Sequence, residues 1–120
     1  MKQKTLIIED NLQNMYMLTY LLEGNNYEVF QAFTGQEGIA KAKELNPDII
    51  LLDIQLPEMD GYSVARALRK IKELKETPII AVTSYAMSGD REKAYASGAT
   101  GYIEKPIDPD TFITQLQAFI

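Results

Sequence analysis

Short apolar runs recur along the chain and alternate with longer segments in which apolar residues return every three or four positions. Several runs are continuously apolar instead of alternating with polar residues, which is typical of strands buried on both faces of a parallel sheet. The five runs predicted as strands are Thr5–Ile8, Val29–Phe30, Ile49–Leu52, Ile79–Val82 and Gly101–Ile103.

The segments between the strands carry signals of helix starts and ends. Thr34 and Glu37 have the spacing of a capping box, and Pro109 follows Asp108 at the first position of the last helix. The predicted caps are Asn11, Thr34, Asp60, Ser88 and Asp108, and the predicted ends lie at Gly24, Asn46-Pro47 and Ser97-Gly98. The predicted apolar faces are Met15, Leu18 and Leu22 in the first helix, Val64, Leu68 and Ile71 in the third, and Phe112, Leu116 and Phe119 in the last.

The order of these elements, a strand followed by a helix repeated five times, predicts an α/β fold. Such a chain forms a five-stranded parallel sheet with right-handed crossovers and helices on both faces. No low-complexity tract or linker interrupts the sequence, so we expect one domain over residues 1–120. Ligands of open parallel sheets bind beyond the carboxyl ends of the strands. The residues directly after each apolar run are therefore the candidates for function.

Charged and hydroxyl side chains occupy these positions. Glu9 and Asp10 follow the first strand, Asp53 the third, Thr83 the fourth and Lys105 the fifth. Two carboxylates about 4 Å apart repel by roughly 4 kcal/mol at an effective dielectric constant of about 20, so three of them need a cation or must take up protons. Mg²⁺ fits, because it binds one or two carboxylates and completes its coordination with waters and phosphate oxygens. The pattern indicates a Mg²⁺ site, with Mn²⁺ able to substitute.

The same residues suit phosphoryl transfer to Asp53. An ionised carboxylate beside a metal can attack phosphorus and form an acyl phosphate without a general base. The cation, the Lys105 ammonium and the Thr83 hydroxyl can each interact with one equatorial oxygen of the transferred group. The loop after Asp53 offers backbone carbonyls to the metal, that of Gln55 among them, and a cis peptide before Pro106 would fix the direction of Lys105.

Composition narrows the chemistry further. The 120 residues include neither cysteine nor histidine, which excludes thiol catalysis, thiolate metal sites and a phosphohistidine on this chain. Any metal must therefore be bound by oxygen. The formal net charge of -5 and the pI of about 4.7 argue against nucleic acid as a partner. The first apolar run is too short for a signal peptide or a membrane span, so we expect a cytoplasmic protein with no membrane partner.

Other charged residues have structural interpretations. Asp48, Asp60 and Asp108 stand at the start of a strand or of helices, where aspartate commonly caps or turns the chain. Glu73 and Glu76 interrupt a run of basic residues on the third predicted helix, so we interpret this run as a solvated helix face and not as a nucleic-acid surface. The basic residues are Arg66, Arg69, Lys70, Lys72 and Lys75.

With these residues in place, the chain closely resembles the receiver domain of two-component response regulators over essentially its whole length. The motifs that carry the resemblance stand in the family's order, and the set is far more specific than any one of them. They are Ile8-Glu9-Asp10-Asn11, Leu52-Asp53-Ile54-Gln55-Leu56-Pro57 with Met59-Asp60-Gly61, Val82-Thr83-Ser84, Ser97-Gly98-Ala99 and Tyr102-Ile103-Glu104-Lys105-Pro106. Within the family, the chain is most similar to single-domain cell-cycle regulators and to the receivers of hybrid histidine kinases.

The resemblance implies a fold, a reaction and a ligand set. The fold would be the doubly wound sheet of chemotaxis regulators, (βα)5 with strand order 2-1-3-4-5. Asp53 would accept a phosphoryl group from the phosphohistidine of a sensor histidine kinase or a histidine phosphotransfer protein. Mg²⁺ would be bound by Asp10, Asp53 and the Gln55 carbonyl, with Glu9 acting through water. Thr83 and Lys105 would contact the phosphoryl group.

The resemblance also implies an output. Tyr102 matches the family's switch aromatic, which turns inward when Thr83 moves towards the phosphate; the alternative is an ordinary aromatic at a sheet edge. The movement would change the surface formed by the fourth helix, fifth strand and fifth helix. Because no DNA-binding output domain follows, we expect the chain to signal by contact with a downstream protein target. We further expect a phosphoacceptor and not an enzyme, present as a monomer or weak dimer.

Other functions compete with this one. A flavin-binding electron carrier shares the fold but needs a Ser/Thr/Gly-rich phosphate loop where Glu9, Asp10 and Asn11 stand. A phosphatase of the aspartyl-phosphate type would have a second acid at the position of Gln55. A third alternative is a receiver-like scaffold that binds partners without phosphorylation.

We further expect Tyr85 to restrict water at the acyl phosphate and so slow its loss, which a Tyr85→Ala variant would test.

Overall fold

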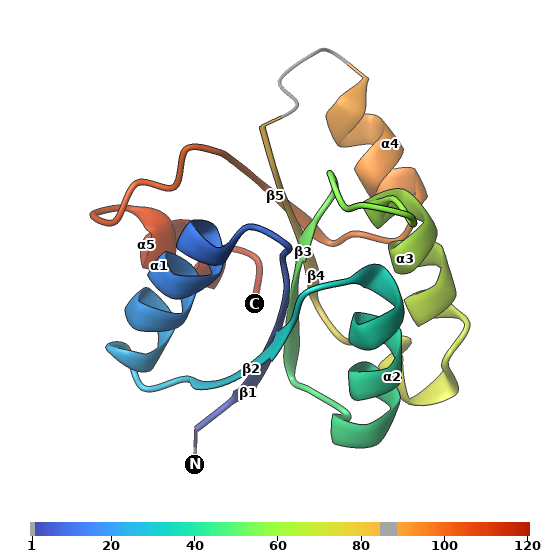
Figure 1. The fold of residues 1–120 in the computed structure, drawn as a ribbon, viewed down its shortest axis with the longest axis horizontal. Coiled ribbons are helices and arrows are strands. Elements are labelled where there is room, and N and C mark those ends of the chain that lie inside the picture. The colour runs from blue at the N-terminus through green and yellow to red at the C-terminus, as the bar shows by residue number, and fades with distance from the viewer. Residues whose placement is uncertain (1, 85–88) are drawn as a thin grey trace.

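The computed structural model describes residues 2–84 and 89–120, and it confirms the predicted α/β architecture. Five parallel strands form one sheet in the order β2-β1-β3-β4-β5 (Figure 1). The strands are β1 (Lys4–Ile8), β2 (Glu28–Ala32), β3 (Ile49–Asp53), β4 (Ile79–Thr83) and β5 (Gly101–Glu104). The helices are α1 (Leu12–Glu23), α2 (Gly35–Leu45), α3 (Gly61–Arg69), α4 (Asp90–Ala96) and α5 (Phe112–Gln117), and the 3-10 helix η1 (Lys72–Leu74) follows α3.

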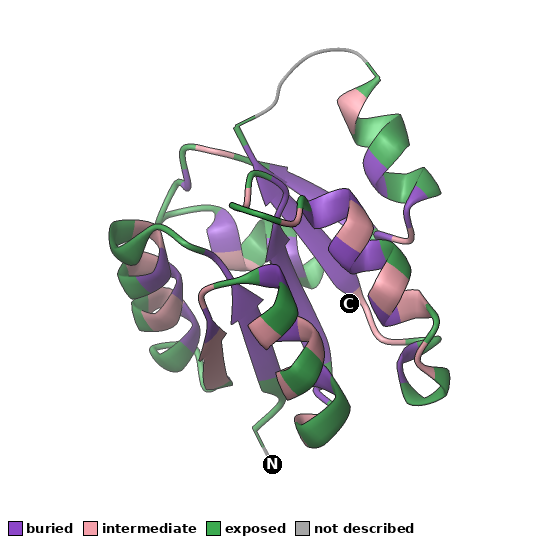
Figure 2. Cartoon of the chain, turned by 45° about the vertical axis from the view of Figure 1, so that its right-hand side comes forward, coloured by how far each residue is buried: buried purple, intermediate pink, exposed green. Residues whose placement is uncertain are grey.

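Helices cover the sheet on both faces, α1 and α5 on one side and α2, α3 and α4 on the other (Figure 1). Every residue of β3 and β4 is buried, which explains why these strands are apolar without alternation. Side chains that point to opposite faces enter separate parts of the core, so Ile7 packs with the α1 and α5 residues and Ile8 with those of α2 and α3. Figure 2 shows the buried strands between helices whose outer faces are exposed.

Three predicted N-caps are confirmed. The side chain of Asn11 accepts a hydrogen bond from the Asn14 N–H at 2.9 Å, and that of Asp60 accepts one from the Ser63 N–H at 2.9 Å. Thr34 accepts from the Glu37 N–H at 3.0 Å. The Glu37 carboxylate accepts from the N–H of the residue before Thr34 and so does not complete the predicted capping box.

Predictions at two helix ends are wrong. The third helix stops at Arg69, and Ile71 lies beyond it in extended conformation, directly before η1. The last helix begins at Phe112 and not after Asp108, whose side chain accepts from the Asp110 N–H at 2.9 Å. That local bond closes a separate turn before the helix. Phe119 follows the end of α5 and Ser88 lies outside the described residues.

The register of the parallel strands places their carboxyl ends side by side. Asp53, the last residue of β3, pairs with Val82, and Thr83, the last residue of β4, pairs with Glu104. The Lys105 N–H then donates to the Thr83 carbonyl at 2.8 Å. Within residues 2–84 and 89–120, no helix combines the length and the apolar character needed to cross a membrane.

Candidate functional site

Three acidic side chains meet at the carboxyl edge of the sheet. Glu9 and Asp10 follow β1, and Asp53 ends the neighbouring strand β3. Each offers a carboxylate oxygen, and these oxygens all lie within 4.8 Å of one another. Glu9 is 1% exposed and Asp53 3%, whereas Asp10 is open to solvent. The cluster therefore has two buried carboxylates and one that a ligand can approach from outside.

Lys105 supplies positive charge to the two buried carboxylates. Its ammonium nitrogen lies 2.9 Å from Glu9 Oε1 and 3.3 Å from Asp53 Oδ2, and its side chain is only 13% exposed. Buried carboxylates are costly unless they are paired in this way. Since Lys105 directly follows β5, pairing of β5 with β4 delivers the ammonium to the acids of β1 and β3.

Backbone N–H groups hold the remaining carboxylate oxygens. The Gln55 N–H donates to Asp53 Oδ1 at 3.0 Å, and the Asn11 N–H donates to Glu9 Oε2 at 3.1 Å. Each bond comes from the residue two positions later, so the loop itself orients its acid. Both buried carboxylates thus have one oxygen at a backbone donor and one at the Lys105 ammonium.

The environment of Glu9 favours its neutral form. Burial raises the pKa of this carboxyl, and the hydrogen bond and negative charge of Asp53 raise it further. The Lys105 ammonium and the Asn11 N–H act in the opposite direction on the same pKa, but burial has the larger effect. Glu9 is therefore a group whose charge depends on what else binds in the cluster.

The donor set fits a hard divalent cation. Glu9, Asp10 and Asp53 carry three negative charges when ionised, and Lys105 carries one positive charge, which leaves a net charge of −2 in the cluster. One Mg²⁺ or Mn²⁺ would neutralise that charge, and all the side-chain ligands are the oxygens that such ions prefer.

Thr83 and Tyr102 occupy buried positions beside this edge. Thr83 is fully buried at the end of β4, and Tyr102, in the neighbouring strand β5, is 7% exposed. Tyr102 packs with the residues of a small core cluster that includes Ile54 and Ala81, and the guanidinium carbon of Arg91 lies 5.2 Å from the centre of its ring. Burial, followed by the charges of Asp90 and Glu104, raises the pKa of Tyr102, so its hydroxyl stays protonated at neutral pH.

Two further features belong to the loops of the site. The Lys105–Pro106 peptide bond is cis. The Ser84 hydroxyl donates to the side-chain oxygen of Gln55 and so connects the loops after β3 and β4. The sequence assigned no role to Ser84, although a hydroxyl directly after a strand end was a usable signal. Tyr85 lies outside the described residues.

The basic run has a more specific structure than a solvated helix face. The interpretation of the run as a solvated helix face is wrong for Arg69, which is half-buried. Its guanidinium donates to the Gly98 carbonyl at 2.9 Å and to the Leu74 carbonyl at 2.6 Å. Burial lowers the pKa of its guanidinium. Arg69 therefore ties the end of α3 to the turn before β5, whereas the other basic residues of the run are exposed.

The chain is similar to signalling proteins over its full length. A model of the response regulator receiver domain family matches residues 5–117. The polar-differentiation response regulator DivK of Brucella ovis is 40% identical over 120 residues, which cover 100% of this chain and 98% of that protein. The chemotaxis protein CheY4 of Vibrio cholerae has a TM-score of 0.95 at 32% identity, with 100% of both chains covered. The receiver domain of a sensor histidine kinase from Pseudomonas aeruginosa PAO1, solved with a magnesium ion coordinated in its active-site cleft, has a TM-score of 0.90 at 33% identity, covering 99% of this chain and 98% of that one.

Proposed function

The chain belongs to the response regulator receiver domain family, and on that premise we propose that it is a phosphorylation switch whose phosphoacceptor is Asp53. Receiver domains take their phosphoryl group from histidine kinases or histidine phosphotransfer proteins, and phosphorylation on aspartate is characteristic of them. The observation that carries the assignment is the convergence of Asp53 with Glu9, Asp10 and Lys105 at one strand edge.

In the proposed reaction a carboxylate oxygen of Asp53 attacks the phosphorus of a partner's phosphohistidine. A phosphorus–oxygen bond forms, the phosphorus–nitrogen bond breaks, and the electron pair leaves with the imidazole of the partner, which binds a proton from solvent. Lys105 balances the charge of the phosphoryl group from its place beside Asp53. The Gln55 N–H keeps the carboxylate oriented, because it holds one oxygen at 3.0 Å.

Asp10, Asp53 and the Gln55 carbonyl are the proposed ligands of Mg²⁺, with Glu9 acting through water. When bound, the ion supplies a Lewis acid that offsets the charge of the phosphoryl oxygens, and Mn²⁺ can take its place. The charge of −2 that the cluster carries when all three acids are ionised, and its all-oxygen donor set, support this assignment. The magnesium ion in the active-site cleft of the solved relative supports the same choice of ion.

Incubation with acetyl phosphate and Mg²⁺, followed by intact mass measurement, tests the phosphoacceptor. The parent should gain one phosphoryl group, and Asp53→Asn should gain none. Asp110→Asn is the matched control, because it removes an exposed carboxylate that does not belong to the acidic cluster. No gain in the parent, or equal gain in Asp53→Asn, would contradict the assignment and favour a scaffold that acts without phosphorylation.

The α4-β5-α5 face is the proposed output surface. Tyr102 lies in β5 beneath Arg91 of α4, and Arg91 also approaches Glu104 at 3.7 Å. When Thr83 moves to contact the phosphoryl group, Tyr102 and these surface contacts rearrange, and a downstream protein binds one arrangement better. Backbone amide shifts on phosphorylation should therefore spread from Thr83 to α4 and β5; shifts confined to the loops around Asp53 would refute this output.

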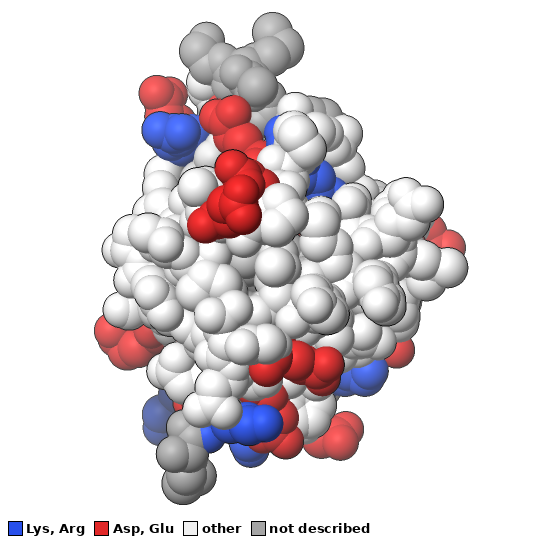
Figure 3. Space-filling model, turned by 90° about the vertical axis from the view of Figure 1, so that its left-hand side faces the viewer, with Lys and Arg blue, Asp and Glu red and all other residues white. Residues whose placement is uncertain are grey.

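The exposed side of α1 is the proposed contact for the phosphodonor. Leu12, Tyr16 and Tyr20 lie on one helical face at four-residue spacing and are 72%, 73% and 69% exposed. This helix starts directly after the acids of the site, and much of the surface on its side carries no charged side chains (Figure 3). Apolar and aromatic residues exposed together are typical of protein contacts.

A single substitution tests the α1 contact separately from the phosphorylation reaction at Asp53. Tyr16→Glu should slow phosphoryl transfer from the partner kinase, yet leave the rate with acetyl phosphate unchanged. Tyr95→Glu, which alters an exposed tyrosine on α4, is the control and should leave both rates near those of the parent. Equal loss with both donors would place the effect of Tyr16 in the site instead of in the contact.

A further inference from the structure

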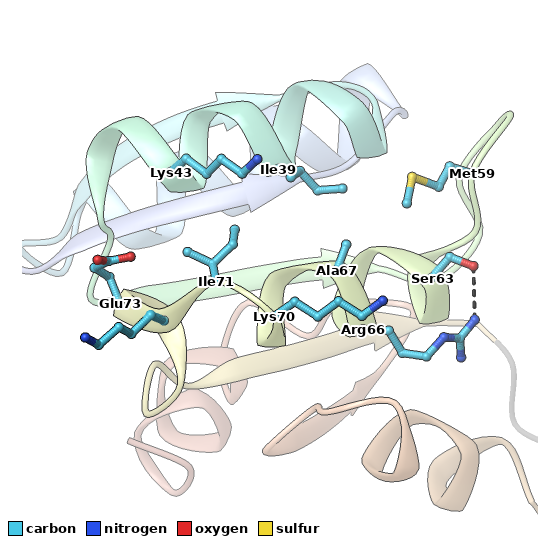
Figure 4. Close-up of a pocket in the computed structure, with 10 residues that line it drawn as sticks. Ile39, Lys43, Met59, Ser63, Arg66, Ala67, Lys70, Ile71 and Glu73 are labelled. Carbon is cyan, nitrogen blue, oxygen red and sulfur yellow. Dashed lines mark hydrogen bonds between the residues drawn. The ribbon is translucent and has the colours of Figure 1, made fainter.

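A groove between α2 and α3 lies apart from the phosphorylation site. Its volume is about 730 Å³, and its floor is apolar, formed by Ile39 of α2, Met59, Ala67 of α3 and Ile71 (Figure 4). These four residues are only half-buried, so they present apolar surface to solvent while they also contact the core. We call this depression the basic groove, after the charges on its rim.

Four cationic side chains line the basic groove and only one anionic side chain does. Lys43 comes from α2, Arg66 from α3, Lys70 from the residue after α3, and Lys72 from the start of η1. The whole chain has 17 acidic and 12 basic residues, so this is a reversal of its overall charge. In Figure 4 Lys43 and Lys70 extend along opposite sides of the apolar floor.

The rim charges are not neutralised inside the molecule. Among the residues that the structure describes, Lys43, Lys70 and Lys72 have no carboxylate within ion-pair distance, whereas Lys105 and Arg91 are both paired. Arg66 donates to the hydroxyls of Ser63 at 3.1 Å and Ser97 at 3.4 Å, which orient it without balancing its charge. Like charges gathered without counter-charges repel, and an anionic partner would relieve that repulsion.

The shape of the groove favours an elongated partner. Both helices connect strands of one parallel sheet, so they run in the same direction, and residues of both line the groove between them (Figure 4). The 9 residues of α3 span about 14 Å and the 11 residues of α2 about 16 Å, the length of roughly three helical turns. An amphipathic helix docks in such a channel by placing its apolar stripe on the floor.

From these observations we propose that the basic groove binds an amphipathic helix of a partner protein, with an apolar stripe flanked by glutamate or aspartate on both sides. The apolar floor takes the stripe, and the lysines on the two rims pair with the flanking carboxylates. Charge complementarity with both rims excludes a helix with basic flanks. The groove is thus a contact surface separate from α1 and from the α4-β5-α5 face, and it does not depend on the phosphorylation of Asp53.

Titration of the ¹⁵N-labelled chain with a synthetic helical peptide tests the proposal. The probe has leucines at positions i, i+3, i+4 and i+7 and glutamates on both flanks; a second peptide keeps the leucines and carries lysines instead. The glutamate peptide should bind, shift amide signals of α2 and α3, and lose affinity as salt rises. The lysine peptide should bind about tenfold more weakly or not at all.

Charge reversal in the chain gives the matched comparison. Lys43→Glu with Lys70→Glu should weaken binding of the glutamate peptide about tenfold or more. Lys2→Glu with Lys75→Glu makes the same change in net charge at exposed positions outside the groove and should have an effect of about twofold at most. Ala67→Gln fills the floor without altering charge and should also weaken binding.

Several outcomes would overturn the proposal. They are no binding of the glutamate peptide, shifts on another face, equal binding of both peptides, or groove signals that respond only to ATP or to a short single-stranded oligonucleotide. Asp53→Asn should bind the peptide as the parent does, so failure of the phosphoacceptor assignment would leave this result untouched. Thermal melts of each variant check that the fold is intact.

Discussion

Lys105 should stabilise the fold itself, because among the described residues it is the one cation that forms ion pairs with two buried carboxylates. At an effective dielectric constant of about 20, its attractions at 2.9 Å and 3.3 Å correspond to about 6 and 5 kcal/mol. The cost of removing the ammonium from water offsets much of this gain, and loss of one partner from a buried pair typically costs about 3–5 kcal/mol. We therefore expect Lys105→Met to lower the free energy of unfolding by about 3 kcal/mol at pH 8 in EDTA.

Urea denaturation followed by circular dichroism measures this loss. Saturating Mg²⁺ should restore part of it, since the ion brings positive charge to the same carboxylates. Combining Lys105→Met with Glu9→Gln should lower the free energy of unfolding by less than the sum of the two single changes, because the double variant has no buried carboxylate at position 9 to leave unpaired. Lys75→Met removes an exposed lysine and should change stability by about 0.5 kcal/mol or less.

The loss should also depend on pH in a defined direction. The native-state pKa of Glu9 is raised above its ordinary value of about 4.5, so this group contributes stability below that value and loses the contribution as pH rises through its raised pKa. Without Lys105 the pKa of Glu9 rises further, and the difference between parent and variant should shrink as pH falls towards 4.5. A loss below about 1 kcal/mol at pH 8, or one that grows on acidification, would refute the reasoning.

Three further outcomes can be measured on the same protein. Gly61→Ala would place a Cβ 2.5 Å from the Cα of Ile54, so it should destabilise the fold by about 1–3 kcal/mol in urea and slow phosphorylation by acetyl phosphate; unchanged rates would contradict this. Thr100→Val loses the hydroxyl that accepts from the Ile79 N–H at 3.0 Å and should cost about 1 kcal/mol in the same assay, whereas no loss would mean that water replaces the bond. Glu9→Gln should reduce the rise in melting temperature on addition of Mg²⁺, and an equal rise would exclude this carboxylate from the metal site.

The sheet and the acids of the site followed from the sequence for one physical reason. Strands that are buried on both faces must be apolar throughout, so the first charged residue after each run marks the edge of the sheet. Parallel register then brings Glu9, Asp53 and Lys105 together without any knowledge of side-chain conformation. The strand order came from the family resemblance and is confirmed.

Other features were out of reach because they depend on tertiary contacts. Nothing local predicts that Arg69 reaches the Gly98 carbonyl on another element, or that α3 stops before Ile71. The basic groove needs Lys43 from α2 beside residues more than 20 positions later, and a scan along the chain sees only the later ones. The predicted helix cap at Asp108 was wrong for a different reason, since an aspartate before a proline serves equally as a helix cap or as a turn former.

The acids and the ammonium of the site are far apart along the chain, at residues 9, 53 and 105, and the ammonium comes last. During synthesis Asp53 leaves the ribosome well before β5 exists, so a partly made chain has the proposed phosphoacceptor but lacks the Lys105 ammonium that pairs with it. The same holds for a copy whose β5 has come away from β4. Under the proposed function, a chain would accept phosphate only once β5 has paired with β4, so phosphorylation would report that the sheet is complete.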